Sequence, residues 1–221
     1  SKGMIPVLST LGDPVEHGYV ESLKGSGTNL GGVAQQNISL TPKRLELLKE
    51  LVPNIKKVAI FYDTNCGPTK KARPIANALA QKIGVTVTEF PLTNPSREDL
   101  EQALAAVTRG EYDGLLFYPH GSLFSKSDLF LKHATQENLP IIMPNEEALE
   151  QGAIAVYGPS YADMGKLIAR VAEKILTDKL EVKNLPWEQP STIHYFVSQT
   201  NAAKLKIPIN QETASKAKIV K

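Results

Sequence analysis

The side chains able to perform nucleophilic or metal chemistry are few in this chain of 221 residues, which has one cysteine and four histidines. Cys66 follows an apolar run, as a nucleophile can, but no histidine lies near it in sequence, so an inert thiol is favoured. The histidines show no spacing typical of a metal-binding pair; they are His17, His120, His133 and His194. A Gly-x-Ser-x-Gly nucleophile elbow is also absent. We therefore expect no catalytic residue, no metal site and no cofactor.

A glycine-rich segment, residues 25–32, invites comparison with a phosphate-binding loop. A P-loop needs a lysine after its last glycine, and none follows Gly31 or Gly32. The dinucleotide fingerprint fails as well, because Leu30 stands where its third glycine would be. We interpret the segment as a tight turn between a helix and a strand, because glycine tolerates positive φ.

The remaining candidates depend on the elements that position them. Short apolar runs predict strands at residues 5–8, 57–62, 85–90, 114–118, 140–143, 153–157 and 193–197. Amphipathic stretches predict helices at 40–52, 74–83, 96–107, 127–137 and 161–176. In the second of these helices, Ile75, Leu79 and Ile83 are expected to form the buried stripe. Strands alternating with helices of this length predict an α/β fold with right-handed βαβ units and parallel sheets.

Polar and aromatic side chains follow several predicted strands, at the sheet edge where open α/β proteins bind ligands. Each is also explained by ordinary turn or cap chemistry, and Asn145 suits the N-cap of the segment after it. Together they suit a small polar or aromatic solute held by hydrogen bonds and ring stacking. Asp13 is a candidate partner for a ligand ammonium group. The candidate ligand-binding residues are Thr10, Asp13, Asp63, Thr64, Asn65, Tyr118, His120, Asn145 and Tyr157.

Composition narrows the class of protein. The 25 basic and 23 acidic residues give a net charge of +2, which is too balanced to indicate a nucleic-acid surface. No apolar run approaches the roughly 20 residues of a membrane-spanning helix. The first residues contain no export signal, so the protein either is not exported or has its signal outside this chain.

An ordered series of motifs resembles the bacterial ABC-transporter solute-binding family that includes tryptophan- and tyrosine-type binding proteins. The first motifs are Gly12-Asp13-Pro14-Val15, residues 18–23 and residues 27–33. Residues 43–53 with 57–59 resemble the inter-lobe helix and next strand of that family, and residues 185–190 and 201–208 resemble its C-terminal signature. The Asn29-Leu30-Gly31-Gly32 segment departs from the usual Asn-x-Thr-Gly of the family.

The resemblance implies two Rossmann-like lobes of the type I periplasmic binding-protein kind, with ligand between them and the first lobe incomplete in this chain. We assign residues 1–52 to part of lobe 1 and a crossover helix, and 53–156 to lobe 2. Residues 157–190 return to lobe 1 and form a linker, and 191–221 form a C-terminal strand and helix whose lobe is not assigned. The halved lobe is expected to expose an edge and an apolar face. Either the chain is a fragment, or a homodimer covers the gap.

The implied role is capture of a small molecule, preferably an aromatic or other amino acid, and its delivery to an ABC permease. A periplasmic or extracytoplasmic site follows, with a lipoprotein anchor as one variant. Sugars and nucleosides also stack on tyrosine and stay open as ligands. Two rival functions are a ligand-sensing domain of the same fold and a small α/β enzyme using Cys66 or His120.

Overall fold

The computed structural model describes residues 5–221, which form two compact units. The first unit contains the chain up to Asn37 together with Pro159–Ile193, and the second contains Ile38–Gly158 and His194–Lys221. The chain first passes from one unit to the other after Asn37. The reason is helix α1 (Thr41–Leu51), which packs against α2 (Gly67–Lys82) within the second unit.

A single run of strands forms the centre of the second unit. Strand β3 (Lys57–Asp63) pairs in parallel with β4 (Thr86–Leu92) on one side and with β5 (Gly114–Phe117) on the other. A parallel bridge between Leu115 and Ile141 links β5 to the next strands, which follow in the order β6 (Ile142–Met143), β7 (Ala155–Pro159), β8 (Ile193–Ser198) and β9 (Lys218–Val220). The carboxyl ends of β3, β5 and β6 consequently meet at one edge of the sheet.

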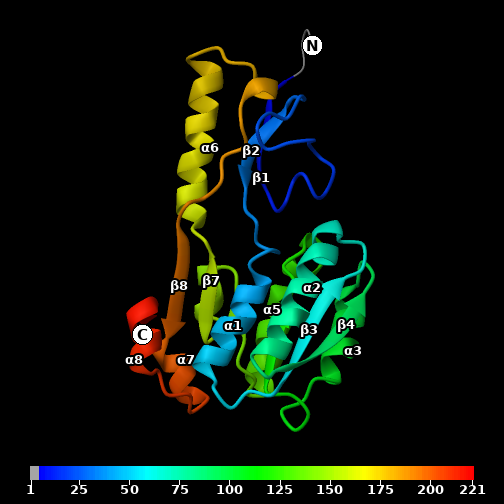
Figure 1. Ribbon diagram of the computed structural model, residues 1–221, viewed down its shortest axis with the longest axis vertical. Helices are drawn as coiled ribbons and strands as arrows, with labels where there is room; N and C mark the ends of the chain where they lie inside the picture. Colours follow the sequence, from blue (N-terminus) through cyan, green and yellow to red (C-terminus); the bar gives the residue numbers. More distant parts are fainter. Residues whose placement is uncertain (1–4) are drawn as a thin grey trace. The chain divides into compact units, whose positions relative to one another are not determined.

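Helices cover both faces of this sheet, as the continuous apolar runs require. Val58 and Ile60 pack into the cluster built with α1 and α2, whereas Ala59 and Phe61 pack into the cluster built with α3 (Arg97–Ala105) and α5 (Ser127–Gln136). Figure 1 shows α1 and α2 side by side along β3. The other helices of this unit are α4 (Gly121–Phe124), η1 (Glu146–Leu149), α7 (Gln199–Lys204) and α8 (Gln211–Lys216).

The first unit has a much smaller sheet. Strands β1 (Val7–Leu11) and β2 (Leu30–Ala34) run parallel, and α6 (Tyr161–Leu176) packs on both. The segment after η2 (Val182–Asn184) carries Trp187 into a small core, and Glu188 bridges to β2. Within residues 5–221, β1 pairs with no strand except β2, so its other side is an edge.

This edge is also apolar, as expected of an incomplete lobe. Ile5, just before β1, is 80% exposed, and Val7, its first residue, is 47% exposed. The predicted strand at residues 5–8 therefore exists in shifted form but is not buried, because this short sheet has little to cover it. The α/β class with parallel sheets is confirmed.

Two details of the sequence interpretation are wrong. The glycine-rich segment does not end as a turn, since its last three residues belong to β2. Gly32 is needed there because a Cβ atom would lie 1.9 Å from the Ser9 carbonyl oxygen of β1. Helix α2 begins at Gly67 rather than Pro74, and it buries Ala72, Ala76 and Ala80 instead of the predicted stripe, of which Ile75 is exposed.

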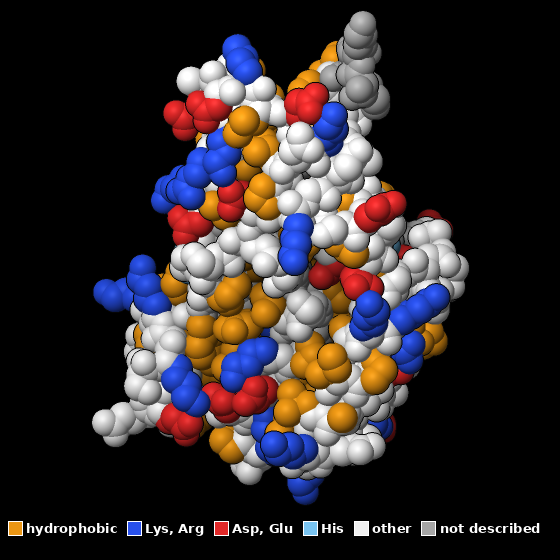
Figure 2. Space-filling model, turned by 45° about the horizontal axis from the view of Figure 1, so that its top comes forward, with side chains coloured by type: hydrophobic (Ala, Val, Ile, Leu, Met, Phe, Trp, Pro, Cys, Tyr) orange, Lys and Arg blue, Asp and Glu red, His pale blue; other side chains and the backbone are white. Residues whose placement is uncertain are grey.

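The surface carries both signs of charge. In Figure 2, basic and acidic side chains are interspersed over the visible face. Among the helices of residues 5–221, none is both long enough and apolar enough to cross a membrane.

Candidate functional site

A cluster of polar side chains lies where β3, β5 and β6 end in the second unit. We call this the carboxyl edge and define it by Asp63, Thr64, Asn65, His120, Ser122 and Asn145. Parallel strands place their carboxyl ends on the same side, and neighbouring strands lie about 4.8 Å apart. Since β5 lies between β3 and β6, Asp63 and Asn145 stand roughly 10 Å apart along this edge.

Asp63 is the centre of a hydrogen-bond network that ties two loops together. Its side chain is fully buried, and Oδ1 accepts the backbone N–H of Asn65 at 2.8 Å. The Ser122 hydroxyl donates to Oδ2 of Asp63. His120 Nδ1 lies 3.0 Å from Ser122 Oγ and 3.6 Å from Asp63 Oδ2. Loops after β3 and β5 are therefore held by one carboxylate.

The same contacts keep this carboxylate ionised. Burial by itself raises the pKa of Asp63, but the hydrogen bonds from Ser122 and from the backbone of Asn65 and Asn94 outweigh it, with a smaller contribution from the charge of His120. The pKa of Asp63 consequently lies below its usual value. A negative charge is present at the carboxyl edge at neutral pH.

Two further predicted residues lie on this edge. Thr64 Oγ1 is 2.7 Å from Thr93 Oγ1, which joins the loop after β3 to the loop after β4. Asn145 donates from Nδ2 to Glu147 Oε2 at 2.9 Å, while its Oδ1 atom is buried and has no hydrogen-bond partner among residues 5–221. An unpaired buried acceptor is unfavourable unless something else satisfies it. Asn145 is thus available to accept a hydrogen bond from a bound molecule.

Two of the predicted aromatic residues are turned toward the helices instead. Tyr118 packs into the cluster built with α1 and α2, and burial raises the pKa of its phenol. Tyr157 lies within β7, and its ring contacts that of Tyr195 edge-on at 6.1 Å. The structure therefore does not bring these two rings together with Asp63 and His120.

The remaining two predicted residues belong to the first unit. Thr10 is on β1, opposite Val33 of β2, and Asp13 follows β1 in the left-handed backbone region at φ 50°. Asp13 is half-buried, and its carbonyl accepts the backbone N–H of His17 at 3.1 Å. Both residues lie near the carboxyl end of their own short sheet.

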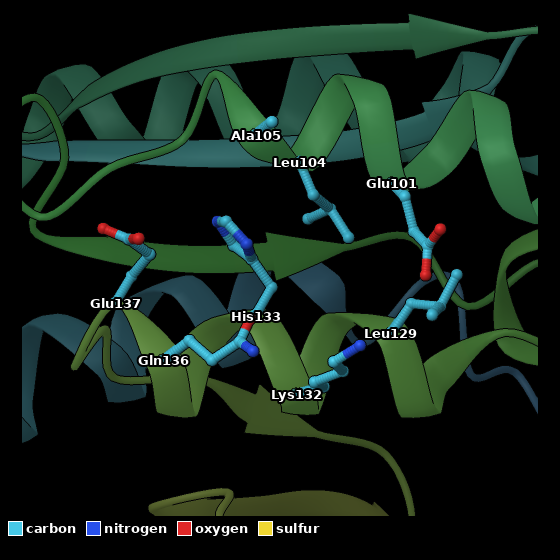
Figure 3. Close-up of a pocket in the computed structure, with 8 residues that line it drawn as sticks. All are labelled: Glu101, Leu104, Ala105, Leu129, Lys132, His133, Gln136 and Glu137. Atoms are coloured by element: carbon cyan, nitrogen blue, oxygen red, sulfur yellow. The ribbon is translucent and has the colours of Figure 1, made fainter.

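A groove of about 320 Å³ separates α3 and α5 on the helical layer of the second unit. Figure 3 shows Leu104 and His133 directed into the space between the two helices. His133 Nε2 lies 2.7 Å from the Val107 carbonyl, and Leu104 belongs to the core, so both side chains have structural roles. Most of the residues that line this groove come from the carboxyl-terminal halves of α3 and α5. In a βαβ unit these halves point away from the carboxyl edge, so the groove lies apart from that edge.

The sequence analysis missed Ser122, although the hydroxyl contacts both His120 and Asp63. Its partner Asp63 is 59 residues away in sequence, so no local pattern reveals the pair. The short segment His120-Gly121-Ser122, at a strand-to-helix junction, was the available indication.

Comparison with known proteins decides the family. The sequence matches the family described as ABC transporter substrate binding protein over residues 2–221. The chain belongs to this family. The resemblance drawn from its sequence motifs is therefore confirmed.

Individual relatives agree with this assignment. A tyrosine-binding protein of Clostridioides difficile (strain R20291) is 30% identical over 176 residues, which are 79% of this chain and 50% of the relative. The chain thus spans about half the length of that curated relative.

Two solved structures share the fold. One is the ABC domain in complex with L-Trp from Streptococcus pneumoniae, with a TM-score of 0.82 and 22% identity over all of this chain and 75% of that one. The other is the ligand-free, open structure of a substrate binding protein with adhesive properties from Clostridium difficile. It gives a TM-score of 0.67 and 27% identity over 98% of this chain and 71% of that one. The expected type of α/β fold is confirmed.

Proposed function

We propose that the chain is the solute-binding part of an ABC import system. It captures a small molecule in a cleft between its two units and presents it to a permease, outside the cytoplasm. The main support for this proposal is the hydrogen-bonded cluster of polar side chains at the carboxyl edge, in a chain that belongs to the substrate-binding family. Ligands of open α/β sheets bind at such edges.

The hydrogen-bond directions at this edge favour binding over catalysis. Ser122 donates its hydroxyl proton to Asp63, a carboxylate whose pKa is below its usual value. An activated serine nucleophile would instead donate to a base that takes the proton. Ser122 therefore acts as a fixed polar group that holds His120 and Asp63 in place.

An aromatic amino acid is the ligand that we propose. This choice is supported by the tyrosine-binding relative and by the L-Trp complex of the structural neighbour. On this chain, the unpaired Oδ1 atom of Asn145 would accept a hydrogen bond from the ligand ammonium group. Asp13 would supply a carboxylate from the first unit. Paired in this way, a buried ammonium charge is compensated.

Binding would proceed by closure of the two units. The chain crosses between them after Asn37, Gly158 and Ile193, and these connections would act as the hinge. The ligand would shift an open–closed equilibrium toward the closed state, because only that state contacts it from both sides. The closed state would then dock on the permease.

A thermal-shift screen of L-tyrosine, L-tryptophan, other amino acids, sugars and nucleosides tests the proposal. A ligand at one hundred times its dissociation constant stabilises the folded state by about 2.7 kcal/mol. For a chain of this size, that raises the melting temperature by roughly 5–10 °C.

Asn145→Ala should lose most of the shift given by the aromatic amino acid, because the ammonium acceptor is removed. Asn184→Ala is the matched control, since Asn184 is an exposed residue beside Glu181 in the first unit. A wild-type protein stabilised only by sugars or nucleosides would contradict the proposed ligand class. Equal shifts for the two variants would contradict the role of Asn145.

A further inference from the structure

The beginning of helix α2 has a property that the proposed function leaves unexplained. The helix starts at Gly67, immediately after the carboxyl edge residues 63–65, and its N-cap residue Cys66 makes no capping hydrogen bond through its side chain. No acidic side chain stands in its first turn. The first amides of any helix have no intrahelical acceptor, so this end presents N–H donors and a partial positive charge.

Thr69 supplies a second and independent observation. It is 1% exposed, and its Oγ1 atom is buried without a hydrogen-bond partner among residues 5–221. Buried hydroxyl groups are nearly always paired, so an unpaired one calls for an explanation. Side chains on a helix lean toward its N-terminus, and the Thr69 hydroxyl therefore points toward the first turn of α2. Gly67, at the first helical position, is only half-buried, so this turn reaches the surface.

The charges near this turn favour an anion. Lys70 is an exposed cation close to the positive end of the helix, where a bound negative group would reduce the unfavourable interaction of its charge with the dipole. Arg73 is held one turn further on by Glu89. The opposing negative charge is Asp63, which is already engaged by Ser122, Asn65 and His120.

We propose that the first turn of α2 binds the carboxylate of the amino acid ligand, with the Thr69 hydroxyl and the amides of Gly67 and Thr69 as donors. This inference rests on the proposed function and specifies one subsite of it. It divides the recognition of the ligand: the α2 turn takes the carboxylate, and Asn145 with Asp13 takes the ammonium group. Ligands that lack the carboxylate should then bind weakly, because they cannot accept the hydrogen bond from the Thr69 hydroxyl.

The test is calorimetric titration of L-tryptophan and of tryptamine, which lacks the carboxylate, into the wild type, Thr69→Val and Thr69→Ser. A hydrogen bond to a charged group corresponds to about a 10- to 100-fold change in affinity. We expect Thr69→Val to lose this factor for L-tryptophan and to leave the weaker binding of tryptamine unchanged. Thr69→Ser keeps the hydroxyl and should retain most of the affinity for L-tryptophan.

Thr86→Val is the matched control, because Thr86 is an exposed residue at the opposite end of the same sheet. It should bind L-tryptophan like the wild type. Because valine has nearly the shape of threonine and removes an unpaired buried hydroxyl, the Thr69 variant should melt no lower than the wild type without ligand.

If Thr69→Val binds L-tryptophan as tightly as the wild type does, the carboxylate subsite is wrong and the proposed function stands. If the wild type binds no aromatic amino acid, both are wrong. If inorganic phosphate stabilises the wild type but not Thr69→Val, and L-tryptophan stabilises neither, the turn binds a different anion and the carboxylate proposal is overturned.

Discussion

Replacing Asp63 by asparagine should weaken both the fold and the carboxyl edge. The carboxylate accepts hydrogen bonds from the Asn65 amide and the Ser122 hydroxyl, and its charge assists both. Asparagine keeps the shape and one acceptor oxygen, but it turns an NH₂ group toward Ser122. Hydrogen bonds to charged groups contribute about 1.5–3 kcal/mol each, and burial of the charge offsets part of this. We therefore expect a loss of roughly 2 kcal/mol and a melting temperature about 4–8 °C lower.

The lowered pKa of Asp63 determines how the stability that it contributes changes with pH. The pKa of Asp63 in the folded protein lies below the ordinary value of 3.8, so the unfolded chain binds its proton more readily. The stability that Asp63 contributes is therefore fully present well above pH 3.8 and is lost as the pH falls through the folded pKa. The difference between wild type and Asp63→Asn should be constant from about pH 7 to pH 5 and should shrink below pH 4.

Urea unfolding followed by circular dichroism at pH 7, 5 and 3 measures this difference. Asp128→Asn is the control, because Asp128 forms an exposed ion pair with Arg97, and exposed ion pairs contribute little to stability. An Asp63→Asn protein as stable as the wild type at pH 7 would show that the Asp63 carboxylate does not stabilise the fold. A difference that stays the same at pH 3 would refute its electrostatic origin.

Two substitutions test the fold that supports the site. Gly32→Ala would put a Cβ atom 1.9 Å from a carbonyl oxygen of the neighbouring strand, so β1 and β2 should move apart at a cost of about 3 kcal/mol. In Gly12→Ala the new Cβ atom meets nothing within 4 Å, and this control should change stability little. Fluorescence of Trp187, the single tryptophan, reports this unit directly in urea titrations, and equal unfolding midpoints for the two variants would contradict the close approach. Phe130→Ala should cost about 3–5 kcal/mol because the ring is fully buried and stacks on Phe117 at 4.3 Å; a loss below 1 kcal/mol by the same titration followed by circular dichroism would show that the core can close around the gap.

The second unit follows from its sequence more completely than the first. The run Val58-Ala59-Ile60-Phe61 predicts a strand covered on both faces, and the structure buries alternate residues of it in different clusters. Ser96 predicts a helix start, and it forms a reciprocal capping box with Asp99. Both patterns are local, and local patterns are visible without knowing which distant segments meet.

The errors arise where packing between distant segments decides. Glycines indicate turns in a sequence, but Gly32 is in a strand because β1 approaches it too closely for a side chain. Isoleucine and leucine suggested the wrong inner face for α2, since its close approach to the core requires the smaller Ala72, Ala76 and Ala80. Tyr118 follows β5 and Tyr157 lies in β7, as predicted. The residues beside them in sequence do not indicate the direction in which either ring points.

Contacts between distant segments also determine the site. Asp63 and His120 were recognisable because each follows an apolar run, and the structure does bring them within 3.6 Å through atoms Oδ2 and Nδ1. Ser122 and Thr69 were not recognisable, because their importance comes from a distant partner in one case and from the lack of a partner in the other.

We propose that this chain binds an aromatic amino acid without altering it. Isothermal titration of L-tyrosine and L-tryptophan into the purified protein at neutral pH, followed by chromatography of the recovered solute, tests it most directly. We expect saturable binding of at least one of them with one site per chain, and recovery of the same compound. Absence of heat with both amino acids, or conversion of the solute to a new product, would contradict it.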